Sequence, residues 1–141
     1  MSARGLIHHI DLTVSDLARS RAFYERVLGF LGYRRSADHD NGSDWDRIGE
    51  PFHSIGIVLA RGDGAARTHD RTSPGLHHLA WTSNSREDVD RLHAILQETG
   101  ATILDAPADY PRYGPTYYAV FFADPDGLKL EYVYGATASE L

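Results

Sequence analysis

The chain has 141 residues, enough for one domain with a sizeable core, and its apolar (42%) and charged (24%) contents are those of an ordinary globular protein. The net charge of −6 argues against a nucleic-acid partner, and the absence of cysteine excludes disulfides, thiolate metal sites and a cysteine nucleophile. No apolar run is long enough to span a membrane and the N-terminus lacks the apolar stretch of a signal peptide, so we expect a cytoplasmic protein without a membrane partner.

The first part of the chain is predicted to fold as a strand, a helix and further strands. Alternating apolar residues predict a strand over Leu6–Val14. A 3.6-residue period then predicts a helix that is capped by Ser15 or Asp16 and stopped by Gly29. The polar residues 37–46 are expected to form a turn. The remaining strands of this part are predicted over Leu31–Ser36, Trp45–Ile48 and Ser54–Ala60.

The same order of elements begins again after residues 61–75, which are rich in Gly, Asp, Arg and Thr and are expected to form a linker. A helix capped by Asn84 or Ser85 and ended by Gly100 follows the next strand. A loop is expected over residues 105–115. The strands of this second part are predicted over Leu76–Thr82, Thr102–Leu104, Tyr117–Ala123 and Leu128–Tyr134.

The two parts form a divergent internal repeat, because the segment 9–13 (HIDLT) aligns with the segment 78–82 (HLAWT). Each part reads as a βαβββ unit whose helix covers one face of its strands. We therefore predict an α+β fold over residues 1–141 as one domain. Module one covers about 6–60 and module two about 76–134, and together they form a curved, half-barrel mixed sheet with the helices outside.

Three side chains of this repeat are predicted to face away from the helices. Glu131 alternates with apolar residues of the last strand, and a buried charge is costly unless it is paired or bound to metal. His9 and His78 occupy equivalent positions on the first strands of the two modules. One strand histidine alone is usually structural, but two equivalent imidazoles and a carboxylate are the donor set of a divalent metal such as Fe, Mn, Ni, Co or Zn. Three protein ligands leave positions open for substrate, which is typical of a catalytic site.

Three stretches also resemble the signatures of a known family. They are His9-x-x-Leu12-x-Val14-x-Asp16-Leu17, Gly75-Leu76-His77-His78, and Phe121-Phe122-Ala123-Asp124-Pro125-Asp126-Gly127 with Glu131 shortly after it. They are similar to motifs of the vicinal oxygen chelate superfamily, which includes glyoxalase I, fosfomycin-resistance enzymes, bleomycin-resistance proteins and extradiol dioxygenases. The resemblance implies that His9, His78 and Glu131 are the metal ligands. It assigns His8 and His77 to the helix side or the sheet edge, where we expect structural roles.

Two departures from the family pattern limit the prediction of activity. Glyoxalase I-like sites have a fourth ligand, a carboxylate, near the position of Gly56 or Ile57, where this chain has none. Extradiol dioxygenases and fosfomycin thiol transferases commonly have a tyrosine ten residues before the ligand glutamate, where this chain has Phe121. Bleomycin-resistance proteins lack the metal triad, so its presence argues against that class.

The remaining candidate residues come from one loop and from module one. Tyr113 and His53 are the candidate catalytic acid or base, whereas Arg112, Phe121 and Trp45 are candidates for substrate binding. A stiff loop with aromatic packing is an equally good interpretation of the stretch around Tyr113.

We predict a metal-dependent glyoxalase- or dioxygenase-like enzyme. Its metal would chelate vicinal oxygens of a small-molecule substrate and stabilise an enolate or oxyanion in a lyase, isomerase or dioxygenase reaction. The alternative is a non-catalytic protein that sequesters a small molecule, as bleomycin-resistance proteins do. A homodimer is expected, and the modules pair either within a chain or between two chains.

Overall fold

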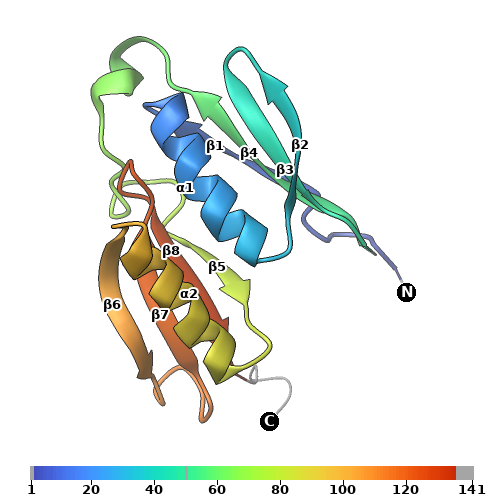
Figure 1. Ribbon diagram of the computed structural model, residues 1–141, viewed down its shortest axis with the longest axis vertical. Coiled ribbons are helices and arrows are strands. Elements are labelled where there is room, and N and C mark those ends of the chain that lie inside the picture. Colours follow the sequence, from blue (N-terminus) through green and yellow to red (C-terminus); the bar gives the residue numbers. More distant parts are fainter. Residues whose placement is uncertain (1, 50, 136–141) are drawn as a thin grey trace. The chain divides into compact units, whose positions relative to one another are not determined.

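The computed structural model describes residues 2–49 and 51–135, which pack as two compact units that divide between Arg67 and Thr68 (Figure 1). Unit 1 is the part up to Arg67 and unit 2 is the part from Thr68 onward. Each unit contains one α-helix that lies on one face of a four-stranded sheet. Each unit has its own core.

Unit 1 is a βαβββ module in which the first strand pairs with the last. Its sheet has the order β1-β4-β3-β2, where β1 runs parallel to β4 and the other neighbours are antiparallel. The helix α1 packs on this sheet through buried residues that include Tyr24, Val27 and Leu28. The elements are β1 (His9–Val14), α1 (Leu17–Phe30), β2 (Arg34–His39), β3 (Gly42–Arg47), β4 (His53–Leu59) and the short 3-10 helix η1 (Gly62–Ala66).

Local signals account for the start and the end of α1. The Asp16 side chain caps the helix by accepting a hydrogen bond from the Arg19 amide at 3.0 Å. The helix continues past Gly29, where the sequence predicts its end, and its last carbonyls are met by the amides of Leu31 and Gly32. Gly32 has φ +94°, so the residue that needs glycine lies after the helix and Gly29 is an ordinary helical residue.

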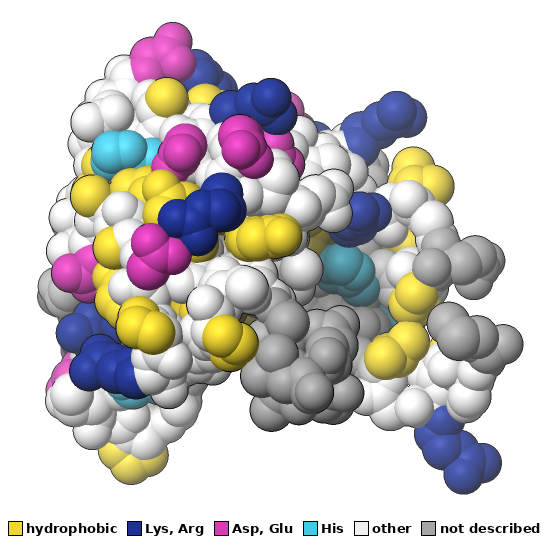
Figure 2. All heavy atoms as spheres, turned by 90° about the horizontal axis from the view of Figure 1, so that it is seen from below, with side chains coloured by type: hydrophobic (Ala, Val, Ile, Leu, Met, Phe, Trp, Pro, Cys, Tyr) yellow, Lys and Arg dark blue, Asp and Glu magenta, His cyan; other side chains and the backbone are white. Residues whose placement is uncertain are grey.

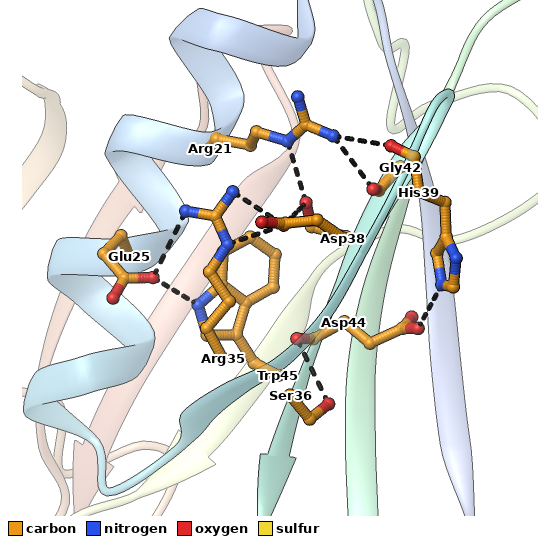
Figure 3. A network of polar contacts seen from close by, with 10 residues as sticks. Arg21, Glu25, Arg35, Ser36, Asp38, His39, Gly42, Asp44 and Trp45 are labelled. Carbon is orange, nitrogen blue, oxygen red and sulfur yellow. Dashed lines mark hydrogen bonds and ion pairs between the residues drawn. The ribbon is translucent and has the colours of Figure 1, made fainter.

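The polar residues 37–46 do not form the expected turn, because most of them belong to the hairpin of β2 and β3. An arginine of α1, distant in the sequence, donates hydrogen bonds to polar groups of this hairpin (Figure 3). The Arg21 guanidinium of α1 donates to Ser43 Oγ at 2.8 Å and to the carbonyl oxygens of His39 at 2.9 Å and Gly42 at 3.0 Å. The prediction of a turn was wrong because composition alone does not reveal this contact.

Unit 2 repeats the topology of unit 1. Its sheet has the order β5-β8-β7-β6, with β5 parallel to β8 and the other neighbours antiparallel. Ser85 caps its helix and Gly100, at φ +71°, follows the helix end as predicted. The second strand of unit 2 continues to Asp109, through residues that were expected to form a loop. The elements are β5 (Leu79–Thr82), α2 (Arg86–Glu98), β6 (Thr102–Asp109), β7 (Tyr118–Ala123) and β8 (Lys129–Tyr134).

These observations confirm the α+β class and the two βαβββ modules, and they show that the strands are hydrogen-bonded in two sheets of four. Among the described residues, no helix is both long and apolar enough to cross a membrane. Figure 2 shows basic and acidic side chains side by side on the face drawn, so the described part of that face carries mixed charge. The core of each unit lies between its helix and its sheet, which leaves the opposite sheet face to carry the candidate site.

Candidate metal centre

Glu131 is a buried carboxylate on the sheet face that points away from α2. Its neighbour Tyr132 donates a hydrogen bond to Asp88 of α2 at 3.5 Å, so strand alternation directs Glu131 to the other face. There Glu131 lies between Ala80 of β5 and Phe121 of β7 in register, and only 2% of its surface is exposed. The orientation predicted for Glu131 is therefore observed, together with burial that requires partners for the charge.

Both oxygens of the Glu131 carboxylate have a partner within unit 2. Oε1 lies 3.1 Å from Nε2 of His78, and Oε2 accepts a hydrogen bond from the hydroxyl of Tyr117. His78 directly precedes β5, two residues before Ala80, and this places it on the same face as Glu131. Two of the three predicted ligands are thus brought together by the sheet of unit 2.

Tyr117 is a residue that the sequence analysis missed. Burial, and then the hydrogen bond to Glu131, raise its pKa above the usual value of a phenol, so Tyr117 remains a proton donor at neutral pH. The signal for it was present in the sequence, because Tyr117 has the same strand phase as Phe121. The family pattern directs attention to position 121, whereas the hydroxyl that contacts the carboxylate comes from four residues earlier.

The loop 110–117 forms an aromatic wall next to Tyr117. The Tyr113 ring lies 5.3 Å from the ring of Tyr117 and stacks on Tyr110 at 5.8 Å, and Tyr110 also contacts Phe121 at 5.4 Å. The exposed Arg112 donates to the Tyr113 hydroxyl at 2.9 Å. Burial and the nearby Asp105 raise the pKa of Tyr110. Tyr113 and Tyr110 therefore contact the phenol that donates to Glu131. Arg112 and Phe121 lie one contact further away, against Tyr113 and Tyr110 respectively.

His9 is the corresponding residue of unit 1. It begins β1, pairs with Ser54 of β4, and alternates with Leu12 and Val14 so that it faces away from α1. Its ring is exposed, and its Nδ1 lies 3.1 Å from Nδ1 of His8. His9 and His78 thus have the same place on the first strand of their own unit.

At the position where a glyoxalase I-like site has its fourth carboxylate ligand, side chains of the two neighbouring strands fill the space. Gly56 of β4 pairs with Asp11 of β1 and with Asp44 of β3. A Cβ atom at Gly56 would lie 2.4 Å from Oδ1 of Asp11 and 2.7 Å from Oδ1 of Asp44, so a larger residue does not fit without displacing these carboxylates. β4 itself carries no acidic residue here, as the sequence shows, but two carboxylates from the flanking strands lie over the vacant side-chain position.

Two predicted site residues need correction, because strand alternation points them toward α1. Trp45 is fully buried beneath the helix, and its Nε1 donates to Oε2 of Glu25 at 2.8 Å (Figure 3). His53 has the phase of buried Ile55, and its Nε2 is hydrogen-bonded to the hydroxyl of Tyr33. Burial and the charge of Arg47 lower the pKa of His53. Trp45 and His53 therefore point toward α1 and do not lie on the face of His9.

Comparisons with known proteins identify the family of the chain. Residues 6–132 match the Glyoxalase/Bleomycin resistance protein/Dioxygenase superfamily. The chain belongs to this superfamily. It is 35% identical over 127 residues to the uncharacterised protein YqjT of Bacillus subtilis, covering 90% of this chain and 97% of YqjT.

Two further members of the superfamily are informative. The glutathione transferase FosA of Serratia marcescens is 30% identical over 135 residues, covering 96% of this chain and 84% of FosA. A crystal structure of a glyoxalase-like protein from Bacillus halodurans superposes with a TM-score of 0.79 at 34% identity, covering 94% of this chain and 97% of that one. The fold and the sequence thus place the chain in the same superfamily.

The donor set of unit 2 fits a divalent cation. Within the described residues of either unit, no three His, Asp or Glu side chains gather closely enough to hold a metal ion. Nε2 of His78 and Oε1 of Glu131, however, are 3.1 Å apart. Two ligands that bind one cation at about 2.1 Å and at about a right angle are about 3 Å apart. An imidazole and a carboxylate at this spacing match the distance between two adjacent ligands of one cation, and a complete site needs further donors.

Proposed function

We propose that this chain is a metal-dependent enzyme of its superfamily and that His9, His78 and Glu131 hold a divalent cation. Iron, manganese, nickel, cobalt and zinc all suit two imidazoles and one carboxylate. The bound cation would act as a Lewis acid that chelates two neighbouring oxygens of a small substrate and stabilises an enolate or oxyanion. The observation that carries this proposal is the burial of Glu131 with its Oε1 directed at Nε2 of His78.

The burial of Glu131 supports a ligand role because a carboxylate without compensation is expensive to bury. Tyr117 compensates only one of its two oxygens, Oε2. The other oxygen, Oε1, faces an imidazole nitrogen, which suits either a hydrogen bond or a shared cation. Tyr117 thereby fixes the orientation of the carboxylate and leaves Oε1 for the ligand position.

The residues around this carboxylate suggest how a substrate is oriented. Tyr113 is 55% exposed, so its hydroxyl is available to exchange a proton or a hydrogen bond with a substrate. The guanidinium of Arg112, which donates to that hydroxyl, is suited to pair with an anionic oxygen. Tyr110 and Phe121 provide an apolar wall on the same side. Tyr117 keeps its proton at neutral pH, which makes it a donor rather than a general base.

The reaction classes that this site supports are lyase or isomerase chemistry through an enolate, ring-opening dioxygenation, and attack of a thiol or water on an electrophile. The similarity to FosA, which is named as a glutathione transferase, favours the last class as the first to be screened. The substrate is a small molecule with two neighbouring oxygens and, if Arg112 pairs with it, an anionic group.

Cation binding tests this proposal directly. We expect the chelator-treated protein to bind Co²⁺ or Mn²⁺ in calorimetric titrations, and we expect Glu131→Gln, His78→Ala and His9→Ala each to lose most of that affinity. His93→Ala is the matched control, because His93 lies on α2 and therefore on the other face of the sheet. A wild-type protein that folds normally and binds no divalent cation would refute the proposal.

Such a result would favour a second function, the non-catalytic binding of a small aromatic molecule. The stacked rings of Tyr110 and exposed Tyr113 are the observation in its favour. It predicts that Tyr113→Ala weakens ligand binding while chelators have no effect.

We further propose that the protein is a homodimer. His9 belongs to unit 1 and Glu131 to unit 2, so a ligand set can be completed within one chain or by two chains. Mixing His9→Ala protein with Glu131→Gln protein distinguishes these arrangements. Cation binding is restored by the mixture only if two chains share a site.

A further inference from the structure

Each candidate imidazole ligand is preceded in the chain by a second histidine that contacts it. Nδ1 of His8 lies 3.1 Å from Nδ1 of His9, and Nδ1 of His77 lies 2.8 Å from Nδ1 of His78. The ring centroids are 5.3 Å and 5.0 Å apart, with interplanar angles of 86° and 75°. The same contact thus occurs at equivalent positions of two units that otherwise differ in sequence.

A nitrogen–nitrogen contact of this length requires one proton between the two Nδ1 atoms. If His78 carries that proton, its Nε2 has a free lone pair directed toward Glu131, which is the form that binds a metal. If His77 carries it, Nε2 of His78 keeps a proton and donates it to Glu131. The contact between the two Nδ1 atoms is satisfied in both cases.

A histidine suits this position better than a backbone carbonyl, because its Nδ1 can either donate or accept the hydrogen bond, whereas a carbonyl can only accept one. In unit 1 the supporting ring is also fixed in place. The carbonyl of His8 accepts from the Ser54 amide at 3.0 Å, and its ring packs on Phe52 with centroids 5.3 Å apart.

We propose that His8 and His77 are positioning residues that hold the rings of His9 and His78 through an Nδ1–Nδ1 hydrogen bond and so present Nε2 of each ring for cation binding. This inference rests on the proposed function, because it assigns the cation to His9 and His78. Residues that bind the second nitrogen of a metal-bound imidazole fix its orientation, and their loss weakens metal binding about 10- to 100-fold.

The test compares three variants of the full chain by Co²⁺ titration. His77→Phe keeps a ring but removes the hydrogen bond, and we expect its affinity to fall about 10- to 100-fold. His77→Asn restores a side chain that can donate or accept close to the position of Nδ1, and we expect affinity near that of the wild type. His93→Phe on α2 is the control and should be unchanged. Equal affinity of His77→Phe and the wild type, or equal loss in His77→Phe and His77→Asn, would overturn the proposal.

A second measurement separates this proposal from the proposed function. In metal-free protein with ¹⁵N-labelled histidine, we expect a scalar coupling across the hydrogen bond between the Nδ1 nuclei of His77 and His78. Its absence in the wild type overturns the positioning role even if Co²⁺ binds. If Co²⁺ does not bind, the proposed function falls, and the coupling alone then decides whether His77 holds the ring of His78.

Discussion

The hydrogen bond from Tyr117 to Glu131 offers a quantitative prediction. Tyr117→Phe removes the only hydroxyl that donates to Oε2 among the hydrogen bonds of the described residues, and the carboxylate that it leaves is 2% exposed. A hydrogen bond to a charged group contributes about 1.5–3 kcal/mol, and a buried acceptor left without its donor keeps its desolvation cost. We therefore expect the free energy of unfolding of the metal-free protein to fall by about 1.5–3 kcal/mol.

Urea unfolding at neutral pH, followed by circular dichroism, measures this loss. Tyr113→Phe is the matched control, because Tyr113 is exposed and, within the part of the chain that the structure describes, the hydrogen bond to its hydroxyl comes from the exposed Arg112. Removal of this hydroxyl should therefore cost less than about 0.5 kcal/mol. In a Glu131→Gln background the cost of Tyr117→Phe should shrink to about 0.5–1.5 kcal/mol, since the acceptor is then neutral. If Tyr117→Phe and Tyr113→Phe have equally small effects, the carboxylate does not depend on Tyr117 and the assigned geometry is wrong.

Three further predictions concern two core residues and the stability of the protein at alkaline pH. Ser20 is fully buried on α1, and its hydroxyl has no hydrogen-bond partner within the described structure. Ser20→Ala should therefore leave the free energy of unfolding unchanged or raise it by up to about 1 kcal/mol. A clear loss of stability would show that the hydroxyl has a partner. Trp45→Phe should lower the free energy of unfolding by about 1–3 kcal/mol, because it opens space in the core and leaves Glu25 without its indole donor. Unchanged stability would contradict the burial of Trp45. A hydrogen bond to Asp90, and then burial, raise the pKa of Tyr118 from 10.0 to about 12, so the folded state keeps a proton that the unfolded chain loses. Stability should therefore fall as pH rises from 10 to 12, and it should fall less in Tyr118→Phe; equal slopes would contradict the shift.

The orientation of Glu131 was predictable because strand alternation is a local property. Leu130 and Tyr132 are apolar neighbours that face α2, and a period of two then directs Glu131 to the other face. The internal repeat extended the same reasoning to His78, which indeed lies beside Glu131. The role of these residues as ligands remains a prediction.

Register, in contrast, could not be read from the sequence. The approach of Asp11 and Asp44 over Gly56 depends on which residues of β1 and β3 lie opposite β4. Trp45 was assigned to the wrong face because polar residues surround it on both sides, so alternation gave no signal. Its face is decided by α1, where Glu25 accepts from its indole.

The hairpin of β2 and β3 was missed for a related reason. Its polar residues resemble a turn by composition, and the partner that makes a strand favourable there is Arg21, about twenty residues earlier in the chain. Tyr117 was missed because the family pattern pointed to position 121 alone. The first error concerns a contact between segments that are distant in sequence, and the second concerns a residue that lies outside the family motif.

The proposed enzyme depends most directly on the binding of one divalent cation by both His9 and His78. Pulsed electron paramagnetic resonance of the Cu²⁺- or Mn²⁺-loaded protein detects the nitrogen nuclei of bound imidazoles and thereby counts them. We expect two bound imidazoles in the wild type and one in each of His9→Ala and His78→Ala, with His93→Ala unchanged. No bound imidazole in the wild type, or two that persist in both variants, would contradict it.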